Sequence, residues 1–384
     1  MHNIDLFDFS ISQNLLTPII LIVSLLLLLL FGRKKKDLPI VFLLFSWHTL
    51  FSLLYFYFTA GINSVGDSRA YYLNSLSGHN VEFFPGTRFV TFVTYLFTQS
   101  FELSYLNVNL IYNTIGALGL ILLYLSLKKH LENLPWYWTF ILFLPSISYW
   151  SSAIGKDSIS FFAVSLLIYT TAVGRKKIVL YFIVLFLMFM VRPHVAFIMA
   201  VSYLIYFIVQ SKTHIVLKLI VIPIIATGTF LSLGFIQEYT GLDEASLSGI
   251  GDYYDERQGI NMNGGGAIDT SSMPLPLKIF SYMFRPLPFE AHSVIAFVAS
   301  IENTFLLIFF IFIVYRSKSM FKVIFTNERL WLSLYVLLIS IMLSYGLSNL
   351  GIAARQKWMF MPVIIYLLIY LYSTYKLEKA RVYP

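Results

Sequence analysis

Five basic residues lie in short polar segments of an otherwise apolar chain, and their side chains suit phosphate recognition. A guanidinium group can make two parallel, charge-assisted hydrogen bonds to phosphate oxygens. We predict that these side chains converge on one site that binds a diphosphate. The residues are Arg192, Arg285 and Arg355, together with Arg88 and Lys156. The alternative for any one of them is an anchor that reaches lipid headgroups from a helix end.

Three other residues have side chains that could exchange a proton with a substrate hydroxyl or hold a metal. Asp67 lies in the polar stretch after an early apolar run, His194 follows Arg192 by two residues, and Glu290 follows Arg285 by five. We predict that the catalytic residues are among these three. Asp67 could instead cap a loop helix, and Glu290 could be an interfacial residue at a helix start. The sequence leaves open which residue is the general base.

Four further side chains are predicted to contact the substrate: Arg69, Tyr71, Tyr72 and Asp157. Aromatic rings suit the apolar faces of sugar rings. His48, in the middle of an apolar run, is better explained by interhelical hydrogen bonding. The chain contains no cysteine, which excludes disulfides, thiolate metal sites and cysteine nucleophiles. We predict no metal site and no cofactor, and the requirement for a divalent metal stays open.

The elements that position these residues are expected to be membrane helices. Of 384 residues, 58% are hydrophobic and 12% are charged, whereas a soluble domain has about a quarter of its residues charged. A helix that crosses a bilayer needs about 20 mainly apolar residues. The sequence therefore predicts an all-α, polytopic membrane protein with about eleven spans. The expected spans are 15–31, 38–60, 103–127, 136–154, 158–173, 178–191, 195–209, 215–235, 293–315, 330–347 and 358–374.

The distribution of charge predicts the orientation of these spans. The loops assigned to the inner side hold 18 of the 27 basic residues and four acids, and the outer side holds 9 basic and 15 acidic residues. Because cytoplasmic loops are enriched in Lys and Arg, we expect the N-terminus outside and the C-terminus in the cytoplasm. The basic run 33–36 follows the first apolar stretch, which is typical of a retained helix rather than a signal peptide. The same rule explains the net charge of +8 without a nucleic-acid partner.

Residues 1–384 are predicted to form a single transmembrane helical domain with two long outer loops. Loop 61–102 includes the stretch 87–100, which we expect to be a helix at the outer membrane interface. Loop 236–292 is rich in Gly, Asp, Asn and Pro and is expected to be mobile. The hairpin 178–209 has 32 residues for two crossings, about 24 Å each at ~1.5 Å per residue. Its tip is therefore predicted to lie below the outer headgroups and to face a cavity.

The order of several short motifs resembles bacterial polysaccharide polymerases of the Wzy and EpsG kind, over most of the chain. The resemblance implies an enzyme that joins undecaprenyl-diphosphate-linked oligosaccharide repeats. It places that enzyme in the bacterial cytoplasmic membrane, with its active site facing the periplasm or the cell exterior. The motifs are Gly66-Asp67 with Tyr71, Pro145-Ser146 through Trp150-Ser151 to Lys156-Asp157, Arg192-Pro193-His194, Phe284-Arg285-Pro286, and Arg355.

The resemblance also implies roles and partners. The arginines would hold the donor diphosphate and stabilise it as the leaving group, while a carboxylate or His194 would deprotonate the acceptor hydroxyl. The implied partners are a lipid-linked oligosaccharide donor and acceptor, membrane lipid and a chain-length regulator.

Two other functions stay open at this point. A GT-C-type glycosyltransferase would take its sugar from a polyprenyl monophosphate and use an outer-loop acid such as Asp67. Such enzymes usually have a second acid beside the first, where this chain has Ser68. A transporter or flippase of lipid-linked sugar would need polar groups along the whole membrane path, whereas here they cluster at the predicted outer end. A membrane acyltransferase has only His48 in its favour.

Overall fold

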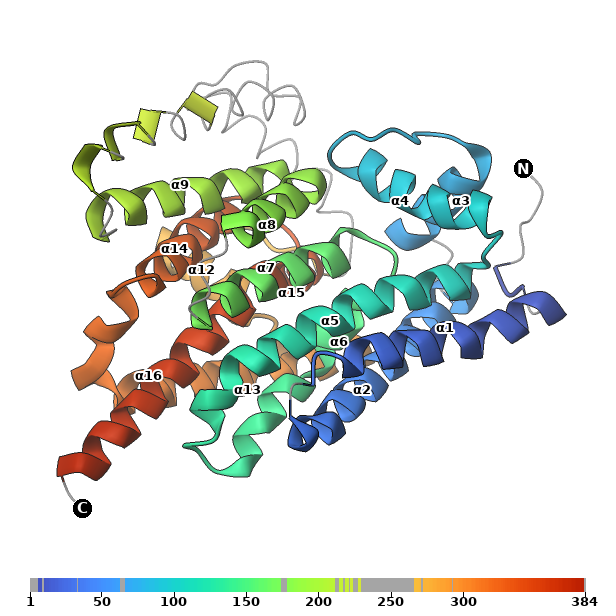
Figure 1. The fold of residues 1–384 in the computed structure, drawn as a ribbon. Helices are drawn as coiled ribbons and strands as arrows, with labels where there is room; N and C mark the ends of the chain where they lie inside the picture. The colour runs from blue at the N-terminus through green and yellow to red at the C-terminus, as the bar shows by residue number, and fades with distance from the viewer. Residues whose placement is uncertain are drawn as a thin grey trace. The chain divides into compact units, whose positions relative to one another are not determined.

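The computed structural model of the chain is helical in all its described regular structure, apart from an isolated antiparallel bridge between Ala267 and Asn349 (Figure 1). The structure describes residues 6–8, 10–32, 34–62, 66–173, 178–210, 214–216, 218–220, 222–223, 227–228, 266–270, 272–291 and 293–382.

The chain divides into two compact units, which are described separately below. Unit 1 comprises Met1–Lys129 and Pro135–Pro193, and unit 2 comprises His130–Leu134 and His194–Pro384. The helices that lie in unit 1, wholly or for most of their length, are α1 (Ile11–Leu29), η1 (Lys35–Asp37), α2 (Leu38–Tyr57), η2 (Phe58–Ile62), α3 (Asp67–Ser77), α4 (Thr87–Ser100), α5 (Tyr105–Leu131), η3 (Trp136–Phe143), α6 (Pro145–Ser151), α7 (Lys156–Ala172) and α8 (Ile178–Val191).

Unit 2 contains nine further helices with described bounds, among them two pairs in which the chain bends sharply between one helix and the next. Ser293 caps α13 by accepting a hydrogen bond from the Ala296 amide at 3.1 Å, and α14 packs against both α12 and α16. The helices are α9 (Pro193–Gln210), α12 (Leu275–Phe284), η4 (Pro288–Glu290), α13 (Val294–Arg316), η5 (Lys318–Phe325), α14 (Arg329–Tyr345), α15 (Leu350–Gln356), η6 (Lys357–Met359) and α16 (Met361–Val382).

Several of these helices are long and apolar enough to cross a membrane. Five helices are long and apolar enough to be single spans. Two bent pairs of helices bring the number to seven if each pair is counted as one span. The coarse expectation of an all-helical protein with several membrane spans is therefore confirmed, while eleven spans and their orientation stay predictions. The five are Ile11–Leu29, Lys35–Gly61, Tyr105–Leu131, Pro193–Gln210 and Ala296–Arg316; the bent pairs are Lys318–Phe325 with Arg329–Tyr345, at 96°, and Leu350–Met359 with Met361–Arg381, at 58°.

Residues 136–154, which were expected to form one span, do not form a continuous helix. The chain forms the 3-10 helix η3, becomes extended at Leu144, and starts α6 at Pro145, which ends after seven residues. Proline lacks the amide proton that a helix interior needs and clashes with the preceding turn, so it favours the first turn of a new helix. The apolar stretch is therefore split into two short helices.

The two predicted outer loops contain helices of their own. Residues 87–100 form α4, as expected for that stretch, and α4 packs against α3. Within 236–292, the apolar segment Leu275–Phe284 forms α12, which the loop interpretation had not anticipated. Residues 236–265 lie outside the described part of the chain.

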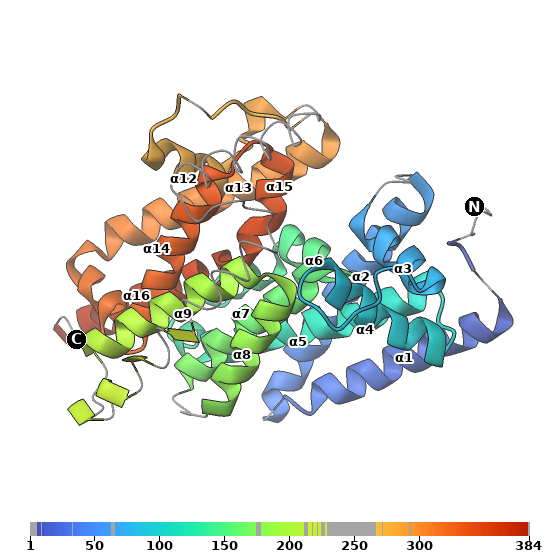
Figure 2. The same cartoon turned by 90° about the horizontal axis from the view of Figure 1, so that it is seen from above.

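Helix α1 contacts α5 through polar side chains as well as through a shared apolar cluster that includes Leu28 and Ile121. The two helices run alongside each other in both views (Figures 1 and 2). The Asn107 side-chain amide donates to Gln13 Oε1 at 2.9 Å, and Thr17 Oγ1 donates to Asn107 Oδ1 at 2.8 Å. Further along, Thr114 Oγ1 donates to Ser24 Oγ at 2.7 Å. Most of the apolar surface of α1 is exposed, as expected for a helix that faces lipid.

Candidate functional site

In unit 1, Arg192 and Asp157 form an ion pair at the ends of two packed helices. Arg192 directly follows α8, and Asp157 is the second residue of α7. Arg192 Nη2 donates to Asp157 Oδ1 at 2.6 Å, and their side chains are only 9% and 11% exposed. Arg192 Nε is also buried, and it has no hydrogen-bond partner among the described residues. A buried guanidinium with an unused donor is suited to bind an oxyanion.

The turn that leads into Asp157 is held by polar side chains of α2 and α5. His48 Nδ1 lies 2.6 Å from Asn113 Oδ1, and its Nε2 lies 2.9 Å from Ser151 Oγ. The Ile154 amide donates to Asn109 Oδ1 at 3.0 Å. These contacts confirm the interhelical role expected for His48, and they fix the start of α7, where Lys156 and Asp157 lie.

A close approach of α5 to this turn depends on Gly116. A Cβ atom at Gly116 would lie 2.0 Å from the Ser151 carbonyl oxygen and 2.7 Å from His48 Cε1. Ser52 adds a further bond from α2, donating to the Ser152 carbonyl oxygen at 2.9 Å. The backbone of 151–155 is thus tied to both neighbouring helices.

The segment 82–88 packs against the end of α8, close in sequence to Arg192. The Gly86 amide donates to the Met190 carbonyl oxygen at 2.8 Å, and the Phe83 ring stacks on Phe186. Arg88 donates to Glu82 Oε2 at 2.7 Å, and this pair is exposed, at 47% and 58%. Three of the five predicted phosphate-binding cations therefore lie in unit 1, at the end of α8 or in segments that contact α8: Arg192, Arg88 and Lys156.

The residues predicted on α3 separate into an exposed and a buried group. Asp67 is exposed in the first turn of α3, and Gly66, not Asp67, is the N-cap. Tyr71 and Tyr72 are 5% and 7% exposed, and Tyr72 donates its hydroxyl to the Leu103 carbonyl oxygen at 3.2 Å. Both tyrosines pack inside unit 1, so the expected sugar-stacking surface is not formed by their rings. Arg69 on the same helix is half-buried.

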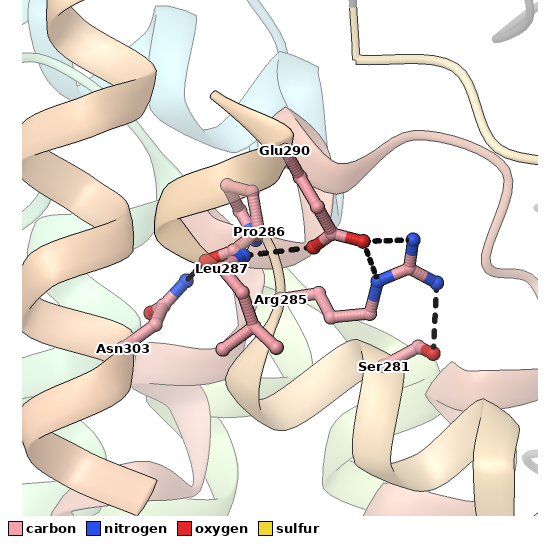
Figure 3. Close-up of polar contacts among 6 residues, drawn as sticks. All are labelled: Ser281, Arg285, Pro286, Leu287, Glu290 and Asn303. Atoms are coloured by element: carbon pink, nitrogen blue, oxygen red, sulfur yellow. Dashed lines mark hydrogen bonds and ion pairs between the residues drawn. The ribbon is translucent and has the colours of Figure 1, made fainter.

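In unit 2, Arg285 and Glu290 form a second ion pair within one short turn (Figure 3). Arg285 Nε donates to Glu290 Oε1 at 2.7 Å, and Nη2 donates to the same oxygen. The Leu287 amide donates to Glu290 Oε2 at 2.8 Å, so both carboxylate oxygens are engaged. Arg285 Nη1 also lies 3.4 Å from Ser281 Oγ. The side chains of Arg285 and Glu290 are 22% and 17% exposed.

The charge state of Glu290 follows from these contacts. Partial burial raises the pKa of its carboxyl group, but the hydrogen bonds from Arg285 and the Leu287 amide, with the Arg285 charge, outweigh burial and leave the pKa lowered. Glu290 is therefore an anion at neutral pH. In this conformation it is a weak base, because a proton would have to displace Arg285.

Sequence reasoning did not single out Lys357, which takes part in the polar contacts behind this second pair. Asn303 of α13 donates from Nδ2 to the Pro286 carbonyl oxygen at 3.1 Å (Figure 3). Its Oδ1 accepts a hydrogen bond from Lys357 Nζ, and both side chains are 1% exposed. The signal in the sequence was a lysine just after Arg355 in an apolar segment, together with an asparagine inside an expected span.

The remaining predicted residues lie in unit 2. His194 is in the first turn of α9, and Arg355 is on α15. Asn349 caps α15, because its Oδ1 accepts from the Gly351 amide at 2.8 Å. The five predicted cations are thus divided between the units, and the single site expected for all of them stays a prediction. Among the described residues, no group of three or more His, Asp or Glu side chains could hold a metal ion.

Together, the described helices define an all-helical protein with several potential membrane spans and two largely buried arginine–carboxylate pairs. A scan against protein-family models and searches of curated proteins and of solved structures found no match to the chain.

Proposed function

We propose that this protein is a membrane glycosyltransferase of the Wzy and EpsG kind, which polymerises undecaprenyl-diphosphate-linked oligosaccharide repeats. In this proposal it crosses the bacterial cytoplasmic membrane about eleven times, and its site faces the periplasm or the cell exterior. The observation that carries the proposal is Arg192, a buried arginine held by Asp157, with an unused Nε donor and Lys156 beside its partner. Burial strengthens the attraction of such a group for a diphosphate.

The proposed reaction is a glycosyl transfer that requires no cofactor. The acceptor hydroxyl oxygen forms a bond to the anomeric carbon of the donor, and the bond between that carbon and the diphosphate oxygen breaks. The hydroxyl proton passes to a base, for which His194 and the site carboxylates are the candidates. The lipid diphosphate leaves with the electron pair, and hydrogen bonds from arginine stabilise its developing charge.

The presence of two largely buried arginine–carboxylate pairs among the described residues also suits this reaction. Both substrates of a repeat-unit polymerase carry a lipid diphosphate, because the donor and the acceptor are each lipid-linked. Among the described residues, each unit has one largely buried pair of this kind, Arg192 with Asp157 and Arg285 with Glu290. Each pair keeps its arginine neutralised and oriented until a stronger anion displaces the carboxylate. Displacement would also free that carboxylate to accept a proton.

The first experiment tests the reaction with purified protein in liposomes. Lipid-diphosphate oligosaccharide repeats and, separately, lipid-monophosphate monosaccharides are supplied, and the products are separated on a gel. The proposal predicts a ladder spaced by one repeat unit, with release of lipid diphosphate. Passage of the lipid-linked sugar across the bilayer without a product would contradict the enzyme assignment.

A variant pair tests the role of Arg192 directly. Arg192→Gln is expected to lower the polymerisation rate by about 100-fold or more, the usual effect of removing a group that stabilises transition-state charge. Arg316→Gln is the matched control, because Arg316 is exposed at the other predicted face, at the end of α13. Equal polymerisation rates for both inserted variants would show that Arg192 does not bind the diphosphate.

A second candidate function rests on Asp67. Its exposed position in the first turn of α3 suits a GT-C-type transferase, in which an outer-loop acid deprotonates the acceptor. Addition of one sugar from a lipid monophosphate donor in the liposome assay, with loss of that activity in Asp67→Asn, would favour this function over the polymerase.

A further inference from the structure

We infer that Asn303 and Lys357 are positioning residues that hold Arg285 and Arg355 in one anion-binding site within unit 2. The identity of the ligand, a diphosphate, rests on the proposed function. The inference goes beyond that function because it assigns a role to two residues that touch no substrate but hold the segments carrying the two arginines.

The first link runs through Asn303. Its Nδ2 donates to the carbonyl oxygen of Pro286, the residue that follows Arg285, at 3.1 Å (Figure 3). Its Oδ1 accepts from Nζ of Lys357, which comes two residues after Arg355. One buried amide therefore connects the backbone of the Arg285 turn to the end of the helix that carries Arg355.

A second link joins the same two segments. The Tyr282 hydroxyl, three residues before Arg285, donates to Oε1 of Gln356 at 3.0 Å. Gln356 lies directly after Arg355. The two links reach the chain just before and just after Arg285, and both reach it just after Arg355. They fix the segments 282–286 and 355–357 relative to each other, and this restricts where the two guanidinium groups can lie.

The burial of Lys357 supports a role beyond packing. Its side chain is 1% exposed, and the buried carboxylate of Glu302 interacts with it electrostatically. A charged or polar group inside a membrane protein is costly unless it is paired, and an apolar side chain would fill the same space without that cost. The cost is offset by the hydrogen bond to Asn303, which an apolar residue at 357 would remove.

The decisive variant is Asn303→Asp, measured on the full-length protein in lipid nanodiscs. Aspartate keeps an acceptor for Lys357 and removes the donor to Pro286. The probe is inorganic pyrophosphate, and binding is measured by titration calorimetry. We expect its affinity to fall about tenfold, as for the loss of one well-placed hydrogen bond.

Two further variants accompany it. Tyr282→Phe keeps the ring and removes the hydroxyl group that bonds to Gln356, so it tests the second link if Asn303→Asp fails to fold. We expect about a fivefold weaker affinity from it. Thr304→Val is the matched control on α13, because among the described residues the Thr304 hydroxyl bonds to the Ser300 carbonyl oxygen of its own helix, at 2.8 Å. This variant should bind pyrophosphate as the wild type does.

Amide hydrogen exchange gives a readout that does not depend on the ligand. The Leu287 amide, bonded to Glu290, should exchange at least about tenfold faster in Asn303→Asp, because local opening of the turn becomes easier. If the wild type binds no pyrophosphate, the diphosphate part of the proposed function fails, and the exchange rates still decide the positioning role. Unchanged exchange in folded Asn303→Asp and Tyr282→Phe overturns the inference.

Discussion

The two largely buried arginine–carboxylate pairs are built in different ways. Arg192 pairs with an acid 35 residues earlier in the chain, so the contact depends on the packing of α7 against α8. Arg285 pairs with an acid five residues later, within one turn. The first pair is only 9% and 11% exposed and the second 22% and 17%. The same chemistry is therefore secured by tertiary packing in unit 1 and by local backbone geometry in unit 2.

The residues behind each pair differ as well. The turn before Asp157 is held by His48, Asn113 and Asn109, whereas the turn after Arg285 is held by Asn303, backed by the ammonium group of Lys357. A pair that depends on packing should be lost together with the structure around it. A local pair should be removable with the fold kept.

The largest expected effect tests this difference directly. Asp157→Ala should destabilise the protein by about 3–5 kcal/mol, because it leaves the Arg192 charge buried without its carboxylate. Glu290→Ala should cost clearly less, since Arg285 is more exposed and can turn toward water. Thermal unfolding of both variants in the same detergent, followed by circular dichroism, gives the comparison. Equal losses of stability in Asp157→Ala and Glu290→Ala would mean that the two pairs depend on tertiary packing to the same extent.

The next effect concerns the support of the first pair. Gly116→Ala should destabilise unit 1 by about 1–3 kcal/mol, because the new methyl group overlaps the Ser151 carbonyl oxygen and the helices must move apart. Gly228→Ala is the control, since Gly228 is exposed in a helix and its Cβ would meet no atom within 4 Å. The variants are compared by their melting temperatures and by exchange of the Ile154 amide. If Gly116→Ala is as stable as the wild type, the packing around this turn is not tight.

Much of the helical architecture was predictable, and the pairing of side chains was not. Long apolar runs predicted α1, α2, α5 and α13, because about 20 apolar residues have few alternatives to a membrane helix. The stretch 136–154 was expected to be a single span because it is apolar throughout, although Pro145 lies near its middle. Hydropathy cannot place helix breaks of this kind when both halves stay apolar.

The candidate site was predictable by residue type only. Arg192, Asp157, Arg285 and Glu290 were each expected to matter, but nothing in their spacing showed that they pair. Which side chain Asp157 contacts depends on how α7 is rotated about its axis when it packs against α8. No pattern in the sequence indicates this rotation. The buried position of Tyr72 was missed for the same reason.

A pH experiment sharpens the comparison further. The folded-state pKa of Glu290 lies below the unfolded-state value, so the stability it contributes is complete above the unfolded-state pKa and is lost as the pH falls through the folded-state pKa. Glu290→Gln should therefore be less stable than the wild type by about 1.5 kcal/mol at neutral pH. The difference should disappear in acid. Melting temperatures of both proteins between neutral and acidic pH test this, and a constant difference would contradict it.

The smallest effect is expected at the third, exposed pair. Arg88→Gln removes an ion pair with Glu82 that is about half exposed on both sides, and a surface pair of this kind contributes about 0–1 kcal/mol. Its melting temperature should stay close to that of the wild type, in contrast to Asp157→Ala. A large loss would show that the packing of 82–88 on α8 depends on Arg88.

The polar contacts between α1 and α5 have a consequence for how the chain is made. Gln13, Thr17 and Ser24 bind partners that lie 90–94 residues later in the sequence. At a synthesis rate of about 5–20 residues per second, α1 leaves the ribosome roughly 5 to 20 seconds before those partners exist. During that interval its glutamine, threonine and serine side chains lack their α5 partners, and α2, lipid, water and the insertion machinery are the groups that they can contact. Helix α1 therefore has unpaired polar side chains in the membrane until α5 has been synthesised.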